Sequence, residues 1–292
     1  MKPLFHKLLT VFTAVALLAG VFGCSSPEDK KQAFLDKGNQ LFEQKDFVKA
    51  RLEYKNAIQI DPKFAEAYFQ LGKTELEEKN FKPAYGAFMK AVELDPDHLE
   101  ARVLLGKILL GGKAVDRAAE QADAVLAKDS GHVDANILKA SVHFMKKEVD
   151  PGEKRLMDLY SAGVTSPDMF LMLTSAARLK KDTDKMRSWL TQGLEKNPDH
   201  LGLLLTQAQI EANMKNFDAA EKSLKKVIDL KPDEPRHRLN LAKLYMATGK
   251  KDHAQKVLEE AMSVNEKDEK LRIGAASFWL AAKHLEKAEE LI

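Results

Sequence analysis

The side chains that could do chemistry in this sequence are scattered singly. Eight histidines invite a metal site, and His98, His132 and His200 recur at multiples of 34 residues. Glu75 and Glu211 lie among apolar residues, yet neither has a neighbouring acid or base with which to transfer protons. The patterns G-x-x-x-x-G-K, G-x-G-x-x-G, H-E-x-x-H and G-x-S-x-G are all absent from the sequence. We therefore predict that the chain is not an enzyme and uses no metal or cofactor.

The single cysteine is informative through its position. Cys24 follows an uncharged run from Leu8 to Phe22, which Lys2 and Lys7 precede. This run is too short to span the hydrocarbon core of a bilayer, which is about 30 Å thick. A short apolar run behind basic residues is typical of a secretory signal. A lone thiol can form neither an internal disulfide nor a cysteine-based metal site.

Val21-Phe22-Gly23-Cys24 resembles the lipobox of bacterial lipoproteins, although Phe22 stands where a small residue is usual. The resemblance implies a signal peptide over residues 1–23, lipid attachment (diacylglyceryl and palmitate-type acyl chains) at Cys24, and a lipid-anchored linker over 24–30. Ser25, rather than Asp, follows the cysteine, which in such lipoproteins implies the outer membrane, with the chain facing the periplasm. Several acyl chains would make this anchoring effectively permanent.

The charges are balanced. The chain has 46 Lys and Arg against 44 Asp and Glu, and loss of Lys2 and Lys7 with the signal leaves 44 of each sign. A neutral mature chain gives no reason to expect nucleic acid as a partner. The 45% of hydrophobic residues supplies a real core, which excludes a disordered protein.

Beyond residue 30 the sequence repeats every 34 residues without insertion. The repeats begin at Lys31, Ala65, Leu99, Val133, Pro167, Leu201, Pro235 and Glu269, and the last is incomplete. Position 8 of each repeat is small or nearly so: Gly38, Gly72, Gly106, Ala140, Thr174, Ala208, Ala242 and Ala276. Position 20 is mostly small as well: Ala50, Ala84, Ala118, Gly152, Met186, Ala220, Ala254 and Ala288. We predict that these two positions face each other where the two helices of a repeat approach most closely.

The first two repeats resemble the tetratricopeptide family, whose pattern is W-x2-L-G-x2-Y, A-x3-F, A, P. The matching residues are Gly38, Ala50, Tyr54, Ala57 and Pro62, then Tyr68, Leu71, Gly72, Ala84, Phe88, Ala91 and Pro96. The resemblance implies an all-α fold: a right-handed α-solenoid of about eight helix-turn-helix units over residues 31–292. The three histidines then fall in loops between repeats, too far apart to share a metal ion, because neighbouring helices lie about 8–10 Å apart.

The ends of the second helices carry separate signals. Position 18 is acidic in Asp116, Asp150, Asp184, Asp218, Asp252 and Glu286, which predicts N-caps, with capping boxes at Asp150–Glu153 and Asp218–Glu221. Prolines at Pro62, Pro96, Pro198 and Pro232 predict that each second helix ends just before them. Repeats four and five match the pattern worst. Because their spacing stays at 34, we interpret this as sequence drift within one array and leave a softer joint there as the alternative.

In this family the first helices of successive units line a groove that positions 2, 5, 9, 12 and 13 face. Position 5 is apolar in every repeat and begins with Leu35, Phe69, Val103 and Ile137. Position 12 includes Phe42, Leu76, Leu110 and Phe144, whereas position 9 is polar, as in Asn39, Lys73 and Lys107. We expect two apolar tracks with a polar one between them, suited to an amphipathic helix or an extended segment with apolar anchors. The alternative, that positions 5 and 12 only pack against the neighbouring unit, stays open.

A carboxylate clamp, which some members use to grip the termini of chaperones, needs Lys and Asn at positions 5 and 9. Asn39, Lys73 and Lys107 offer part of it, but Leu35, Phe69 and Val103 occupy position 5, so we do not expect the clamp.

The resemblance implies a membrane-anchored protein–protein interaction scaffold that binds a partner segment of a bacterial envelope assembly in its groove. Lipoproteins of the PilF type, in pilus biogenesis, and those linked to exopolysaccharide or PEP-CTERM sorting have a similar architecture. The alternative is the substrate-recruiting arm of a longer envelope enzyme or secretion component whose catalytic part follows residue 292. Repeat eight stops at Ile292, on an apolar pair and without a polar cap, which favours such a continuation.

Overall fold

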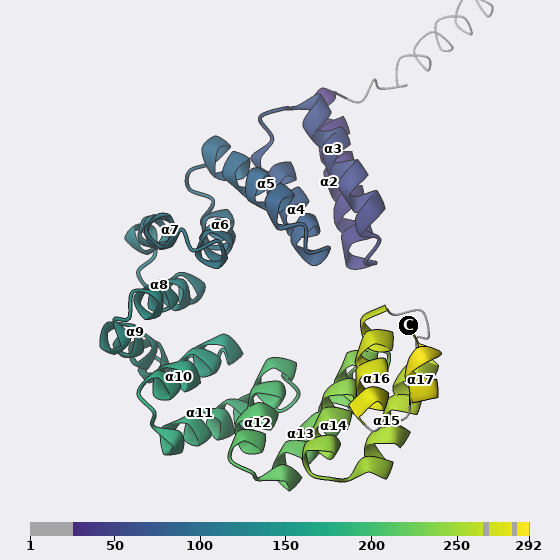
Figure 1. Cartoon of the computed structure of the whole chain (residues 1–292). Helices are drawn as coiled ribbons and strands as arrows, with labels where there is room; N and C mark the ends of the chain where they lie inside the picture. The colour runs from purple at the N-terminus through teal and green to yellow at the C-terminus, as the bar shows by residue number, and fades with distance from the viewer. Residues whose placement is uncertain (1–25, 265–268, 282–284, 292) are drawn as a thin grey trace, which may run out of the picture. The chain divides into compact units, whose positions relative to one another are not determined.

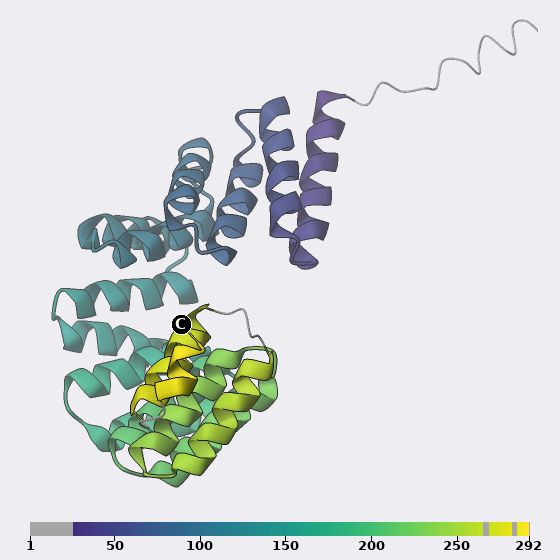
Figure 2. The same ribbon diagram turned by 45° about the vertical axis from the view of Figure 1, so that its right-hand side comes forward.

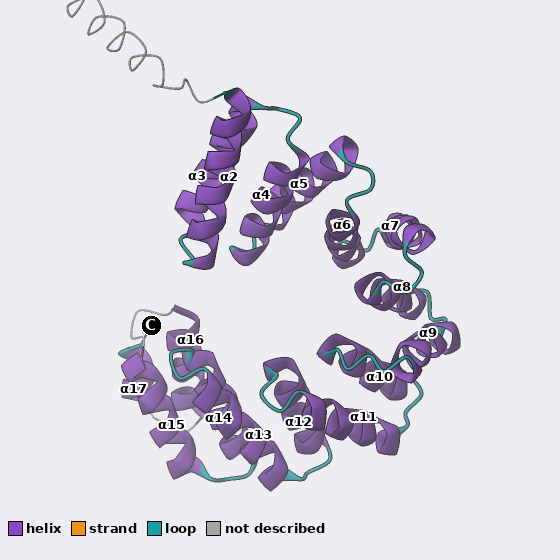
Figure 3. Ribbon diagram, turned by 180° about the vertical axis from the view of Figure 1, so that it is seen from behind, coloured by secondary structure: helices purple, strands orange, loops and turns teal. Residues whose placement is uncertain are grey.

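The computed structural model describes residues 26–264, 269–281 and 285–291. Cys24 and the preceding signal segment lie outside these residues. Everything described is α-helix or short connection, without a β-strand in these ranges (Figure 3). The prediction of an all-α fold is confirmed.

Two helices form each repeat, and the first helix starts at position 1 from the second repeat onward. The helices are α2 (Pro27–Glu43), α3 (Phe47–Ile60), α4 (Ala65–Glu77), α5 (Phe81–Leu94), α6 (Leu99–Gly111), α7 (Val115–Lys128), α8 (Val133–Met145), α9 (Val149–Ser161), α10 (Pro167–Leu179), α11 (Thr183–Lys196), α12 (Leu201–Asn213), α13 (Phe217–Leu230), α14 (Pro235–Ala247), α15 (Lys251–Val264), α16 (Glu269–Ala281) and α17 (Leu285–Glu289) (Figure 1). Only α2 departs from the register. It begins inside the segment expected to be a linker, because Ser26 is the N-cap, Pro27 is the first helical residue, and Asp29 forms a capping box with Ser26.

The helices pack in two compact units, which divide between Ser130 and Gly131. The first unit holds repeats one to three, and the second holds the rest. The division therefore falls between repeats three and four. The weakly matching repeats four and five lie together inside the second unit, where α9 packs against α10. The period of 34 residues does not signal this division, because it stays constant through it.

Within a repeat, two helices joined by a short turn lie side by side and antiparallel, as α2 and α3 do (Figure 2). The small residue at position 8 makes room for a ring. A Cβ added to Gly72 would come within 2.7 Å of Cε1 of Phe88, and one added to Gly38 within 2.5 Å of Cε1 of Tyr54. Both rings are fully buried. The close neighbour of position 8 is thus position 24 in these repeats, and not position 20 as we expected.

Positions 8 and 20 do meet in repeat four. A Cβ on Gly152 would lie 3.0 Å from the carbonyl oxygen of Ala140 and would also collide with the ring of Phe144. Ala50 and Ala84, at position 20 of the first two repeats, are fully buried. Small residues at both positions therefore keep the paired helices close, although a ring fills the gap in some repeats.

The turns between paired helices place position 15 in the left-handed region of backbone space. Lysine occupies it six times, with φ near 60° in each case: Lys45, Lys79, Lys113, Lys147, Lys181 and Lys215. Gly249 takes the same place in repeat seven, with φ of 77°. This conformation lets the turn amides bond back to the end of the first helix, as the Lys79 amide does to Leu76.

The predicted caps need correction. Second helices begin at position 17, so Asp116, Asp150, Asp184 and Asp218 lie in the first turn and not at the N-cap. The capping boxes at Asp150 and Asp218 are wrong for the same reason. A negative charge in the first turn still stabilises the helix through its interaction with the helix dipole, which explains the recurring acidic residue. The ends set by Pro62, Pro96, Pro198 and Pro232 are confirmed, because the helices stop two residues before each proline.

Candidate partner-binding surface

Position 5 is buried in the first four repeats, half-buried in the next three and exposed at Ile273 in the last. Leu35, Phe69, Val103 and Ile137 are each at most 8% exposed. Their burial corrects the expectation of an apolar track at position 5 in these four repeats. The sequence pattern could not distinguish a buried contact between helices from an exposed groove, because both require apolar residues at position 5.

Positions 9 and 12 reach the surface. Phe42, Leu76, Leu110 and Phe144 are half-buried, and Lys107 is exposed. The Lys73 ammonium lies 5.2 Å from the ring centre of Phe42 and 5.5 Å from that of Phe69, so three of the predicted residues meet in one place. This cation–π contact joins repeats one and two on the face of their first helices.

Asn39 is used inside its own repeat. Its Oδ1 accepts a hydrogen bond of 2.9 Å from the Tyr54 hydroxyl. Burial raises the pKa of Tyr54 to about 12, so the hydroxyl stays protonated and can donate. This hydrogen bond fixes the orientation of the Asn39 amide within its own repeat, and Leu35 in the same helix α2 is buried.

Leu76 and Lys107 lie in one pocket of about 680 Å³ between repeats two and three. We call it the apolar seam pocket, and its lining residues are Leu76, Phe81, Lys82, Tyr85, Leu104, Lys107, Ile108, Gly111 and Gly112. They come from the end of α4, the start of α5, the middle and end of α6 and the residue that follows α6. Leu35, Phe69 and Val103 are not among them. Ile137 and Phe144 belong to the second unit.

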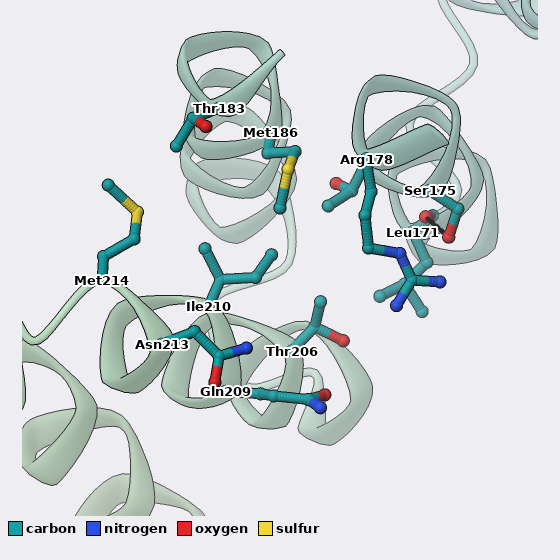
Figure 4. A pocket seen from close by; sticks show the side chains of 11 residues that line it. Leu171, Ser175, Arg178, Thr183, Met186, Thr206, Gln209, Ile210, Asn213 and Met214 are labelled. Carbon is teal, nitrogen blue, oxygen red and sulfur yellow. Dashed lines mark hydrogen bonds between the residues drawn. The ribbon is translucent and has the colours of Figure 1, made fainter. Parts of the chain in front are cut away.

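The second unit has pockets at equivalent repeat positions. One of about 290 Å³ lies between α10, the start of α11 and α12, and one of about 260 Å³ lies between α14 and α16. Figure 4 shows the first of these, with Arg178 from α10 directed between Ser175 and the α12 residues Thr206 and Gln209. A seam on the first-helix face thus opens in both units, with polar side chains around Arg178 and mainly apolar ones around Phe81.

Sequence reasoning missed Phe81, Lys82, Tyr85 and the role of Gly111-Gly112. Phe81 is 60% exposed, and its equivalents Phe47 and Phe217 are half-buried. The signal was present at positions 13 and 14, where repeat three alone carries two glycines. By itself, such a pair in the sequence indicates only a turn.

The three loop histidines act as caps. The Nδ1 atoms of His98, His132 and His200 each accept a hydrogen bond of 3.3 Å from the backbone N–H three residues later. His98 Nε2 also lies 3.4 Å from the Glu66 carboxylate, and this contact raises the pKa of His98. The cap requires an unprotonated Nδ1, so the geometry supports a neutral ring whose Nε2–H points to Glu66. Each histidine thus accepts a hydrogen bond from a backbone N–H that would have no partner at the start of a helix.

The two isolated glutamates have partners that the sequence did not reveal. Arg51 donates to Glu75 over 2.7 Å, and Arg187 donates to Glu211 over 3.0 Å. The side-chain amides of Asn80 and Asn216 also donate to Glu75 and Glu211, over 2.9 and 2.8 Å respectively. Burial would raise the pKa of Glu75, but the hydrogen bonds from Arg51 and Asn80 outweigh it and hold the pKa below its usual range. These carboxylates join neighbouring repeats, and Glu211, with Arg187 and Asn216, also lines a pocket of about 570 Å³.

Metal-binding groups and membrane-spanning helices are both absent from the described residues. No group of three His, Cys, Asp or Glu side chains within ranges 26–264, 269–281 and 285–291 is placed to hold a metal ion. None of the helices in these ranges combines the length and the apolar character needed to cross a bilayer.

Stacked helix pairs of constant period, with open pockets along one helix face, define a helical repeat protein of the interaction class. Comparison with known families agrees. A TPR repeat profile matches residues 38–77, and tetratricopeptide repeat profiles match residues 69–133 and 214–262. The chain belongs to the tetratricopeptide repeat family, whose fold is generally a protein-interaction scaffold and not a catalytic one. The search of curated proteins gives no match.

Solved structures show the same fold. PilF of Pseudomonas aeruginosa has a TM-score of 0.54 at 15% identity, with 70% of this chain and 94% of that chain covered. PilW, described as a type IV pilus biogenesis factor, has a TM-score of 0.58 at 18% identity, with 69% and 94% covered. A tetratricopeptide repeat protein from Parabacteroides merdae has a TM-score of 0.60 at 13% identity, with 89% and 99% covered. At these identities the likeness shows the fold alone.

Proposed function

We propose that the chain is a scaffold of the bacterial envelope, anchored to the outer membrane by lipid on Cys24 and facing the periplasm. It binds a segment of a partner protein on the face formed by its first helices. The lipid fixes where the scaffold acts, and the helix face selects what it holds. No reaction is part of this function.

The apolar seam pocket carries the proposal. Apolar surface exposed in a hollow of this size is typical of a binding site, since it is otherwise covered in a folded protein. The pocket includes Leu76 and Lys107, two residues assigned to the groove from sequence, and it opens between two first helices. The half-buried side chains at position 12 extend this face along the first unit.

The envelope location rests on two supports. The first is the lipobox-like Val21 to Cys24 behind a short apolar run. The second is the shared fold with PilF and PilW, because PilW is described as a pilus biogenesis factor. Fold likeness alone names no partner, so pilus assembly is one of the envelope machines in which to look.

Site-specific photocrosslinking tests partner binding. A benzoylphenylalanine placed at Lys107 lies in the pocket lining, whereas one at Leu52, which is 57% exposed on α3, is the control. We expect irradiated envelope fractions to give a discrete crosslinked partner from Lys107 and none from Leu52. Equal labelling at both positions, or none at Lys107, would oppose the proposal.

The anchor has its own test. Cys24→Ser should abolish metabolic palmitate labelling and release the chain from the outer-membrane fraction or leave it uncleaved. Unchanged labelling in this variant would show that Cys24 is not the attachment site.

A further inference from the structure

The apolar seam pocket is larger than its equivalent around Arg178, at about 680 against about 290 Å³, because the junction between repeats two and three lacks side chains that other junctions have. Gly111 and Gly112 stand at positions 13 and 14, where repeats two, four, five and six carry Glu77 and Glu78, Met145 and Lys146, Leu179 and Lys180, and Asn213 and Met214. A Cβ built on Gly111 would meet nothing within 4 Å. Open space therefore lies where the neighbouring repeats place side chains, and Phe81 stays 60% exposed beside it.

At this junction, uncharged residues replace an ionic contact that joins the repeats at two other junctions. At the first junction, Arg51 stands at position 21 of one repeat, with Glu75 and Asn80 at positions 11 and 16 of the next. Arg187, Glu211 and Asn216 hold the same positions at the fifth junction. At the second junction the same positions are Tyr85, Leu109 and Ala114. The Tyr85 ring consequently lines the pocket, and its hydroxyl accepts a hydrogen bond of 2.7 Å from Arg117.

The charges at the pocket have one sign. Lys82 and Lys107 are the charged residues of the lining, both are exposed, and the Arg117 guanidinium lies 5.7 Å from the Tyr85 ring centre. The volume of about 680 Å³ fits the range of about 300–1,000 Å³ typical of ligand pockets. These residues favour an occupant that offers a large apolar group with negative charge beside it.

We propose that the apolar seam pocket binds an acidic peptide segment of a partner protein, with one aromatic or large aliphatic side chain inserted between Phe81 and Gly111. This inference rests on the proposed scaffold function and names the chemistry of its partner. The inserted side chain covers Phe81, Leu104 and Ile108, and the flanking carboxylates lie beside the exposed side chains of Lys82 and Lys107. A hot spot of this kind combines a desolvated anchor with a charged rim.

The pocket can be filled without disturbing the fold. Gly111→Leu places a side chain in the open space, and the helical backbone at this position requires no glycine. Gly86→Leu is the matched control, because a Cβ on this exposed residue of α5 also meets nothing within 4 Å, and Gly86 does not line the pocket. Circular dichroism melting should show that both variants stay folded.

The probe is a short labelled peptide in which one Trp is flanked by Asp residues, measured by fluorescence anisotropy with the full chain. We expect Gly111→Leu to weaken binding at least about tenfold, as the loss of an anchor pocket does, and Gly86→Leu to leave binding unchanged. Replacing the Trp by Ala, or the Asp residues by Lys, should have a comparable effect. Lys82→Gln with Lys107→Gln should weaken binding and reduce its dependence on salt.

Three results would overturn the inference: equal binding by Gly111→Leu and the wild type, equal binding of the Ala-substituted peptide, or decanoate binding to the pocket where the acidic peptide does not. The last result would assign a lipid site. These outcomes are separate from the scaffold function, because photocrosslinking from Lys107 in envelope fractions can succeed when the probe peptide fails. A bound peptide with no crosslinked partner would instead support the pocket and contradict the scaffold.

Discussion

Arg51 on α3 and Glu75 on α4 form a paired contact between consecutive repeats, in which the arginine Nε donates to the carboxylate over 2.7 Å and Nη2 donates over 3.3 Å. Arg187 and Glu211 repeat the arrangement at the same repeat positions, at 3.0 and 3.5 Å. Tyr245 and Lys250 occupy the glutamate and asparagine positions of the next junction, where Glu221 replaces the arginine and accepts from both. Three junctions are thus joined by polar groups at the same places.

Removing the arginine from such a contact should cost more than removing both partners. Glu75 is 6% exposed, so Arg51→Met leaves a buried carboxylate with Asn80 as its remaining strong donor. We expect a loss of about 1–3 kcal/mol in the free energy of unfolding, measured by urea denaturation. The double variant Arg51→Met/Glu75→Leu should recover part of this loss, since Leu41 and Leu109 hold the same position elsewhere. Purely additive losses would show that the two residues are not coupled.

Acid should weaken the junction at Glu221 in a defined range of pH. The hydrogen bond from Lys225, with those from Tyr245 and Lys250, lowers the pKa of Glu221 from 4.5 to about 2. A lowered folded-state pKa means that the stabilisation is complete above pH 4.5 and is lost as the pH falls toward 2. Glu221→Gln should lower the melting temperature at pH 7, and the difference from the wild type should shrink across this range. A difference that is independent of pH would contradict the assignment.

The glycine at position 8 should not tolerate even one methyl group. In Gly72→Ala the new Cβ would lie 2.7 Å from Cε1 of Phe88, and this ring is fully buried and cannot move aside. We expect thermal melting to show a destabilisation of about 1–3 kcal/mol, as overpacking typically causes. Gly86→Ala is the control, and it should stabilise α5 by about 0.5–1 kcal/mol because its Cβ meets open space. The opposite ranking would refute the packing of Phe88 on Gly72.

The turn lysines should be better replaced by glycine. Lys45 has φ of 61°, a conformation that is unfavourable for residues with a Cβ. Lys45→Gly should therefore raise stability by up to about 1 kcal/mol in urea denaturation. Lys55→Gly, in the interior of α3, should lower stability by about 0.8–1 kcal/mol because glycine is a poor helix former. Destabilisation by both changes would mean that the Lys45 side chain contributes more than its strained backbone costs.

The sequence by itself determined the parts of this protein that depend on residues close along the chain. The period of 34, the first-helix starts at Ala65, Leu99 and Val133, and the ends before Pro62 and Pro96 follow from local propensity, small residues and proline. Each of these signals acts within one or two helical turns, so its meaning does not depend on the rest of the chain.

Only the tertiary structure decided which residues meet across repeats. Whether Phe69 is buried or lines a groove depends on the neighbouring repeat, because both places require an apolar side chain. The partner of Glu75 lies 24 residues away on the preceding helix, which no local spacing reveals. In the sequence alone, Gly111-Gly112 indicates only a turn. Its open space becomes a pocket because α5 lies alongside and leaves Phe81 facing it, and such a contact depends on how the helices stack.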